Sequence, residues 1–263
     1  MTNRNTRVAI IITVAVLLIV GVVAGTRLLN RTPPPVEPSP APASDTPSPS
    51  YEPTDQYGSP EPTLPQGQAI AGGGGTTTGP ADLPLGYSHD ETGAVNAATN
   101  YLTWMNSLRI TDKNTADQLA AATAADNATQ HALIETFDAV RPGMSDMTAD
   151  QPEPARGAYA TADYSADSAL IYIWSPERIM DASGETQHVW GIAGVQLVWV
   201  DGDWKLSGAL IAKVGAAAID PADPSGNPTA QEKHSILSRT PADPGEITDT
   251  ADQSWSEYSN APH

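Results

Sequence analysis

The stretch VQLVWVDGDWKLSG, residues 195–208, constrains the fold more strongly than any other part of the chain. Two runs with apolar residues at every second position flank the dipeptide Asp201-Gly202. This dipeptide is typical of a two-residue type I′ turn, because both of its residues tolerate positive φ angles. The sequence therefore predicts an antiparallel β-hairpin in which Trp199 pairs with Trp204.

The two faces of this hairpin differ in character, because side chains alternate across a strand. The face that we expect to pack on the core is apolar and consists of Val195, Leu197, Trp199, Trp204 and Leu206. The opposite face is mixed and carries Gln196, Val198, Val200, Asp203, Lys205 and Ser207. This contrast indicates a sheet that packs on something from one side. A calcium loop is the alternative for the Asp-Gly-Asp run, but no ligand series that ends in a bidentate glutamate follows it.

The N-terminal part of the chain contains a candidate membrane span. Residues 8–25, VAIIITVAVLLIVGVVAG, are 18 uncharged positions, about the minimum for a helix that crosses a ~30 Å hydrocarbon core. A signal peptide is the alternative, but its apolar region is normally shorter, ~7–15 residues. We therefore predict an uncleaved single-pass transmembrane helix.

The orientation of this helix follows from its flanks. Arginines lie on both sides of it, so the positive-inside count is nearly tied. The long proline-rich and acidic remainder favours a cytoplasmic N-terminus, residues 1–7, and a domain outside the cytoplasm. The expected location is the cell membrane.

Composition divides the remainder into a linker, a domain and a tail. Half of the 24 prolines lie in residues 32–66, and proline fixes φ and removes a backbone donor, so residues 26–80 are predicted to be a spacer. Its glycine run lacks the Gly-Lys-Ser/Thr ending of a phosphate-binding loop. Residues 81–219 have the size of a single domain. Residues 220–263 are predicted to be mostly disordered, with the aromatic pair Trp255 and Tyr258 as inert members.

Helices are predicted in the first half of the domain, where apolar residues recur at helical spacing. Their expected ranges are 88–110, 112–123 and 127–140. Ser88 and Glu91 have the spacing of a capping box for the first helix, and Thr111 is a candidate cap for the second.

Strands are predicted after Pro154, where the period of the apolar residues changes to two. Their expected ranges are 159–164, 169–174, 188–200 and 203–213. The acidic residues of 145–153 are interpreted as a solvated loop. Helices followed by an antiparallel meander indicate an α+β fold, with the helices packed against one face of a curved antiparallel sheet.

The charge of the chain is strongly acidic. The formal net charge is −18, and four of the 13 basic residues lie in residues 1–31, which contain no acidic residue. Nine basic residues therefore stand against 31 acidic ones in residues 32–263, a formal charge of −22. Such a balance argues against nucleic acid as a partner. The absence of cysteine excludes disulfides and thiolate chemistry.

No pattern of catalytic or metal-ligating residues stands out. The five histidines show no ligand spacing such as HxxxH, and no Gly-x-Ser-x-Gly occurs. His89 and His188 are interpreted as polar residues at element boundaries, and Asp90 and Glu91 as residues that serve the start of a helix. We therefore predict no catalytic, cofactor-binding or metal-binding residue and a protein that is not an enzyme.

Three features together carry a resemblance: LPLGYSHDETGAVNAATNYL at 83–102, WGIAGVQLVWVDGDWKL at 190–206, and the anchor with its proline-rich linker. The combination resembles membrane-anchored proteins of actinobacterial integrative and conjugative elements. The hairpin end is also similar to extracytoplasmic domains of Mce-associated proteins and of the bitopic scaffold subunit of type IV secretion machines. The resemblance implies a cone-like, nuclear-transport-factor-like fold with helices in the hollow of a bent sheet. It also implies a role in assembly of an envelope transfer apparatus. This role is implied by the family and not by the fold, since fold alone does not fix function.

Two functions of different classes are therefore expected. The first is a non-catalytic, membrane-anchored assembly or accessory subunit of a secretion or conjugation-like apparatus, which predicts a filled hollow and an apolar outer patch. The second is an extracytoplasmic module that binds a small apolar ligand, which predicts an open pocket with a few polar groups. The tryptophans and tyrosines near the hairpin would plug a hollow, so the first is preferred.

The expected interaction surface is the mixed face of the hairpin, extended back along its first strand. Its candidate residues are Trp190, Ile192, Val198 and Val200, which share the face opposite Trp199 if the register holds. We expect this face to contact another envelope protein or a second copy of the chain. Two alternatives stay open: a bulge at Gly191 or Gly194 that turns Trp190 inward, and a C-terminal segment, 214–225, that covers the face.

Overall fold

The structure of the chain, a computed structural model, describes residues 62–208, 211–213, 227–238 and 254–262. The predicted membrane span at 8–25 and the linker up to residue 61 lie outside the described residues. Within the described ranges, none of the helices is long and apolar enough to cross a membrane.

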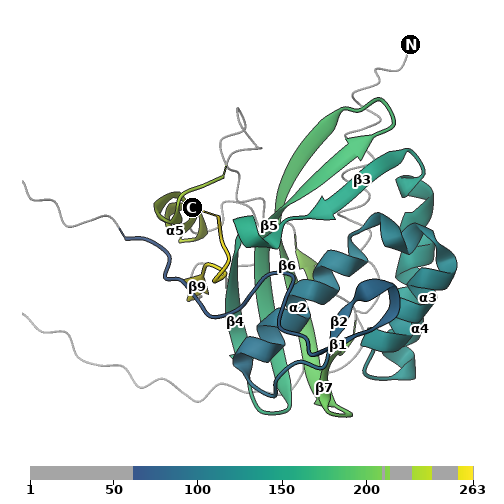
Figure 1. The fold of residues 1–263 in the computed structure, drawn as a ribbon, viewed down its shortest axis with the longest axis horizontal. Coiled ribbons are helices and arrows are strands. Elements are labelled where there is room, and N and C mark those ends of the chain that lie inside the picture. The colour runs from purple at the N-terminus through teal and green to yellow at the C-terminus, as the bar shows by residue number, and fades with distance from the viewer. Residues whose placement is uncertain (1–61, 209–210, 214–226, 239–253, 263) are drawn as a thin grey trace, which may run out of the picture. The chain divides into compact units, whose positions relative to one another are not determined.

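Helices, short 3-10 helices (η) and strands follow one another along these ranges (Figure 1). In chain order they are β1 (Thr77–Thr78), η2 (Pro80–Asp82), β2 (Pro84–Leu85), α2 (Glu91–Met105), η3 (Leu108–Thr111), α3 (Lys113–Thr123), α4 (Asn127–Val140), η4 (Arg141–Met144), β3 (Met147–Pro152), η5 (Pro154–Arg156), β4 (Ala158–Tyr164), β5 (Ser168–Asp181), β6 (Thr186–Val200), β7 (Asp203–Leu206), β8 (Ile211–Lys213), α5 (Ala230–Leu237) and β9 (Trp255–Ser256).

A seven-stranded antiparallel sheet is the centre of the fold. The strands β7, β6, β5, β4 and β9 follow one another in this order, while β3 pairs with β5 and β8 pairs with β6 beyond this path. Beyond the long hairpin that they form together, β5 therefore also pairs with β4 and β3, and β6 also pairs with β7 and β8. The sheet curves around helix α2, and α3 and α4 lie beyond one end of that helix (Figure 1). The predicted α+β class with helices and a curved antiparallel sheet is confirmed.

The predicted hairpin register is confirmed pair by pair. Trp199 lies opposite Trp204, and Leu197 lies opposite Leu206. Asp201 has φ 54° and Gly202 has φ 78°, as a type I′ turn requires. The ladder ends at Leu206, so the predicted strand 203–213 is two shorter strands, β7 and β8.

The main hydrophobic core lies between α2 and one face of the sheet. Helix α2 buries most of its residues between Gly93 and Met105. The sheet contributes the predicted apolar face of the hairpin, with Trp199 partly buried at its border, together with alternate residues of β5 such as Ile171 and Ile173. Burial of this apolar surface is the main force that holds helix and sheet together.

Aspartates cap all three central helices, which corrects two predicted caps. Asp90 Oδ1 accepts a hydrogen bond from Gly93 N at 2.7 Å, so α2 begins after Asp90, and Ser88 instead donates to that carboxylate. Asp112, not Thr111, accepts from Thr115 N at the start of α3. Asp126 caps α4 in the same way. A carboxylate in this position satisfies a free backbone N–H and favours the positive end of the helix dipole.

A strand replaces the predicted solvated loop at 145–153. Residues Met147–Pro152 form β3, which pairs with the distal part of β5. The sequence MTADQP has only Met147 and Ala149 as apolar residues at strand spacing and a single β-branched residue, so pairing with a long neighbouring strand, more than local propensity, determines this element.

A second hydrophobic cluster covers the outer face of the sheet. It consists of Leu64, Ala158, Ala160, Tyr172, Trp174, Trp190, Ile192, Leu237 and Trp255. Leu237 lies on α5 and Trp255 on β9, both within the tail that the sequence predicts to be mostly disordered. The described parts of that tail are ordered because a few apolar anchors bury themselves on an apolar sheet face. The ordered fold therefore extends on both sides of the predicted range 81–219.

Candidate functional site

The four predicted interaction residues share one face of β6, as expected from the parity of the strand. The β5–β6 register continues without a shift from Thr186 to Val198, so no bulge turns Trp190 inward. Trp190 and Ile192 are nevertheless only 5% and 7% exposed. Val198 and Val200 are half-buried. The expectation of an exposed patch is corrected for Trp190 and Ile192, because the second cluster covers both.

The cover over this face comes from the C-terminal clip, residues 254–262, and from α5. Within the clip, β9 pairs with the edge strand β4, with Trp255 opposite Ala160. Trp174 and Trp190 pack against each other beneath, with ring centroids 4.4 Å apart. The expected covering segment, 214–225, lies outside the described residues, and the observed cover comes from residues further along the chain.

The C-terminal clip runs alongside residues 64–71, where the described chain begins. Gly67 N donates to Glu257 O at 2.8 Å, and Ser259 N donates to Ala69 O at 2.8 Å. The Asn260 side chain both accepts from Ala71 N and donates to Ala71 O, each at 3.0 Å. The two ends of the described fold are therefore joined to each other and to strand β4 (Figure 1).

A buried ion pair fixes α5 to the clip. Lys233 Nζ lies 2.6 Å from Glu257 Oε1, and the two side chains are 0% and 5% exposed. Thr229 and Glu232 form the capping box that starts α5. A charge pair this deep is costly to desolvate and is held only where both partners are present.

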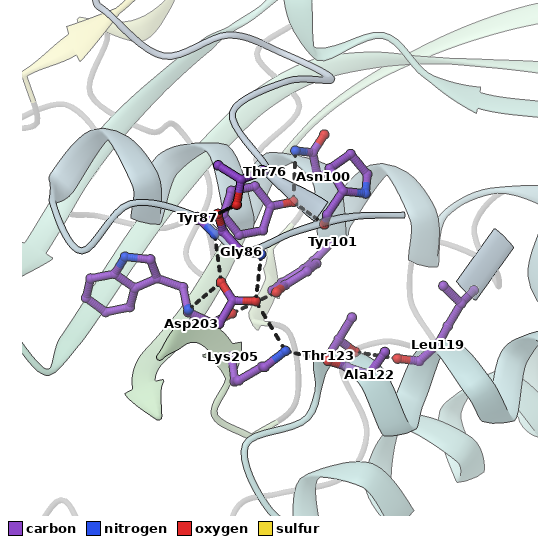
Figure 2. A network of polar contacts seen from close by, with 12 residues as sticks. Thr76, Gly86, Tyr87, Asn100, Tyr101, Leu119, Ala122, Thr123, Asp203 and Lys205 are labelled. Atoms are coloured by element: carbon purple, nitrogen blue, oxygen red, sulfur yellow. Dashed lines mark hydrogen bonds and ion pairs between the residues drawn. The ribbon is translucent and has the colours of Figure 1, made fainter. Parts of the chain in front are cut away.

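Asp203 is the centre of a buried polar network (Figure 2). Its carboxylate accepts hydrogen bonds from Gly86 N at 3.0 Å and from Tyr87 N at 2.9 Å. Lys205 Nζ lies 3.4 Å from the same carboxylate and donates to Ala122 O at 2.7 Å. The network therefore joins the hairpin to the segment before α2 and to the end of α3.

Two tyrosines beside Asp203 complete the network. Tyr101 donates to Trp204 O at 2.7 Å, and Asn100 Nδ2 donates to the Tyr87 hydroxyl at 3.0 Å. Burial raises the pKa of both hydroxyls, and the Asp203 carboxylate raises both further, although the Asn100 hydrogen bond lowers that of Tyr87. Both hydroxyls therefore stay neutral donors. These contacts stabilise the fold and leave no free reactive group.

A second acidic group lies where β3 meets β5. The register places Asp150 opposite Ile179 and Pro152 opposite Glu177, so both carboxyls lie on one face of the sheet. Burial raises the pKa of Glu177 well above its ordinary value, and the Asp150 charge and hydrogen bond raise it further. Burial also raises the pKa of Asp150, against its hydrogen bond with Glu177. We infer that the Glu177 carboxyl is protonated and that its O–H donates a hydrogen bond to the Asp150 carboxylate.

This carboxyl pair by itself does not define a catalytic site. A protonated carboxyl beside a carboxylate resembles arrangements used in acid–base catalysis. Apart from burial, only Asp150 shifts the pKa of Glu177, and only the hydrogen bond with Glu177 shifts that of Asp150. Among the described residues, no group of three or more His, Cys, Asp and Glu side chains could hold a metal ion.

Sequence reasoning missed these polar groups for one physical reason. Asp203 is buried by residues 86 and 87, Lys233 by Glu257, and Asp150 by Glu177. Each partner is distant in sequence, so the local pattern shows only a polar residue in a turn, a tail or a loop. His89, interpreted as a boundary residue, lies before α2, where its Nε2 is 2.5 Å from Ala166 O.

The comparison with protein families gives one match, the model described as "Domain of unknown function (DUF8175)", over residues 30–223. No curated protein and no solved structure matches the chain. The matched range contains α2, α3, α4 and strands β1 to β8 and stops before α5 and the C-terminal clip. Because the model covers well over half of the sequence, the chain belongs to the DUF8175 family.

Proposed function

We propose that the protein is a non-catalytic assembly or accessory subunit of a conjugation-like transfer or secretion apparatus of the cell envelope. In this proposal, residues 8–25 anchor it in the cell membrane as a single pass, and residues 26–61 carry the folded domain away from the bilayer outside the cytoplasm. The domain then acts by contacting other envelope proteins.

The filled hollow between α2 and the sheet is the observation that carries this proposal. Large aromatic side chains occupy it: Tyr87, Tyr101, Trp204 and Tyr258 are each at most 3% exposed. Their polar atoms are satisfied within the protein, as where Trp204 Nε1 donates to Ser88 O at 3.0 Å. The Tyr258 hydroxyl lies 2.8 Å from Thr99 Oγ1. A hollow packed in this way favours a contact role over the binding of a small apolar ligand, which requires open, concave space.

The closed outer face also limits how contacts can be made. The C-terminal clip and α5 cover Trp190 and Ile192, so a partner must use edges, turns or the ends of the sheet. The formal charge of −22 over residues 32–263 keeps an exposed domain soluble and selects partners of opposite charge.

Photo-crosslinking of the full chain in its native membrane tests the proposal. A photoreactive phenylalanine analogue is placed, one position at a time, at the exposed residues Glu135, Glu185 and Asp201, followed by mass spectrometry of the adducts. We expect a discrete adduct with another envelope protein from at least one position, and none without illumination.

The opposite outcome would favour the ligand-binding alternative. It consists of no protein adduct from any of the three positions, together with a small apolar molecule that co-purifies with the chain in native mass spectrometry. That result would overturn the assembly role.

A further inference from the structure

One end of the sheet gathers aromatic side chains that are not fully buried. The β4–β5 turn and the β6–β7 turn lie at this end, beside the start of α2 (Figure 1). Trp199 N donates to Asp167 O at 2.9 Å, which joins the two turns. His89 Nε2 lies 2.5 Å from Ala166 O, which joins the loop before α2 to the β4–β5 turn.

The rings at this end contact one another. The His89 ring stacks on Trp199, with centroids 3.9 Å apart and planes 7° apart. Trp199 meets the buried Trp204 edge to face at 5.4 Å, and Tyr164 lies 6.1 Å from Trp204. Tyr164 is 37% exposed, His89 is exposed and Trp199 is half-buried. These rings therefore form an aromatic surface that is accessible to solvent and packs on the buried Trp204.

Exposed carboxylates lie two or three positions along the chain from each of these rings. Glu91 follows His89 at the start of α2, Asp167 lies in the β4–β5 turn and Asp201 in the β6–β7 turn, and all three are exposed. Partial burial raises the pKa of the Tyr164 hydroxyl, and the charges of Asp90 and Glu91 raise it further. Lys205, on strand β7, lies 3.4 Å from the Asp203 carboxylate and donates to Ala122 O.

We propose that this aromatic end, defined by His89, Tyr164 and Trp199 with the carboxylates of Glu91, Asp167 and Asp201, binds a segment of a partner protein that is rich in lysine or arginine. The inference names the partner chemistry of the assembly role proposed above and rests on it. The ring faces of tyrosine and tryptophan attract ammonium and guanidinium groups, and the neighbouring carboxylates add charge-assisted hydrogen bonds. Neither the rings nor the carboxylates alone offer both a stacking surface and negative charge.

Charge complementarity selects this occupant over a second copy of the chain. Residues 32–263 carry a formal charge of −22, so a second domain would bring like charge to an acidic surface, which costs binding energy. Lysine and arginine side chains fit both features, since their stems pack on rings while their heads reach carboxylates.

Fluorescence anisotropy of a labelled peptide on the purified full chain tests the site. The probe is a dodecapeptide of alternating arginine and serine, and alternating glutamate and serine is the control peptide. We expect the basic peptide to bind and the acidic one not to bind. The triple variant E91Q/D167N/D201N should weaken binding at least tenfold, and Tyr164→Ser alone should weaken it severalfold.

A matched variant separates this site from the overall charge of the chain. The triple variant E135Q/D146N/E185Q removes the same three charges from exposed positions elsewhere. We expect it to weaken binding less than threefold at the same ionic strength. Equal losses in the two triple variants would reduce the attraction to net charge and overturn the site.

The remaining outcomes distinguish this inference from the assembly role. If phosphatidylcholine vesicles bind the chain through Tyr164 and the peptide does not, the surface recognises a lipid headgroup and the inference fails. If the peptide does not bind but native membranes still yield a protein adduct, the inference fails and the assembly role stands. If the peptide binds at this end while native membranes yield no protein adduct and a small apolar molecule co-purifies with the chain, the assembly role fails.

Discussion

Substitution of Gly202 tests the effect of backbone strain on stability without an accompanying packing effect. Its φ is 78°, and a Cβ added there would meet no atom within 4 Å. Gly202→Val should therefore lower the stability of the fold by about 1–3 kcal/mol through backbone strain alone, because a β-branched residue fits positive φ poorly. Thermal unfolding of the full chain, followed by circular dichroism, measures the change.

Asparagine is the matched control for this turn. Gly202→Asn adds a side chain of similar size, but asparagine tolerates positive φ, so we expect a smaller loss than with valine. Equal losses for the two variants would mean that the turn does not need its left-handed conformation.

The raised pKa of Glu177 predicts that the stability of the fold depends on pH. Burial beside Asp150 raises its pKa from the ordinary value of 4.5, so the folded state binds the proton more tightly than the unfolded state. The stability from this group is fully present below pH 4.5 and is lost as the pH rises through the raised pKa. Glu177→Gln removes that loss, and we expect it to stabilise the fold at neutral pH by about 1–3 kcal/mol.

The quantity compared is the free energy of unfolding of the variant minus that of the parent. Denaturant unfolding at pH 4.5 and at pH 7.5 gives two differences, and we expect the one at pH 7.5 to be the larger. Glu185→Gln, at an exposed position, should give no difference at either pH. A constant gain for Glu177→Gln across this range would contradict the half-buried, protonated carboxyl.

Prediction from sequence at this scale works where the deciding contacts are local. The positive φ angles at Asp201 and Gly202, and the burial of Leu197 and Leu206, follow from the turn dipeptide and from strand alternation. The burial of Asp203 and Glu177 does not, because residues far along the chain provide it. The environments of these two carboxyls were therefore not recognisable from the sequence.

At the scale of elements, the Lys233–Glu257 ion pair determines how α5 holds the C-terminal clip. Removing either partner leaves the other charge buried and unpaired, at a typical cost of about 3–5 kcal/mol. We expect Lys233→Met to lower the free energy of unfolding by this amount. Glu257→Leu should have an effect of the same size. Denaturant unfolding of the full chain measures both.

The double variant completes this test. Lys233→Met with Glu257→Leu replaces the pair with apolar side chains, and such replacements are often close to neutral. We therefore expect the double variant to be more stable than either single variant. If the two single effects simply add, the side chains do not form a buried pair.

Elements with a strong period were predicted, and elements that depend on a neighbour were not. Helices α3 and α4 lie at the predicted ranges, because apolar residues recur at helical spacing along both of them. Strand β3 pairs along β5 without a pattern of its own. Helix α5 and β9 occur in a segment dominated by proline and charge, where Leu237 and Trp255 are the few apolar anchors.

At the scale of the whole described fold, a sheet is covered on both faces, and the two ends of the described residues close it. The helices cover one face, while the C-terminal clip and α5 cover the other. Gly67 shows how closely the first described segment fits against β4 and the clip, since a Cβ there would lie 1.8 Å from the Tyr159 hydroxyl and 3.2 Å from Glu257 O. The predicted interaction face at Trp190 and Ile192 is therefore an internal surface for as long as the clip stays in place.

Removal of the C-terminal clip should convert that internal surface into an exposed one. A chain that ends at residue 253 loses Trp255 from the outer cluster and Tyr258 from the main core, both of them buried. Loss of one buried aromatic side chain costs about 3–5 kcal/mol, so we expect at least this destabilisation, faster hydrogen exchange in β4 and binding of an apolar dye. A chain that ends at Ala261 should behave like the parent. Unchanged exchange in Ala158–Tyr164 after removal of residues 254–263 would show that the clip does not protect this edge.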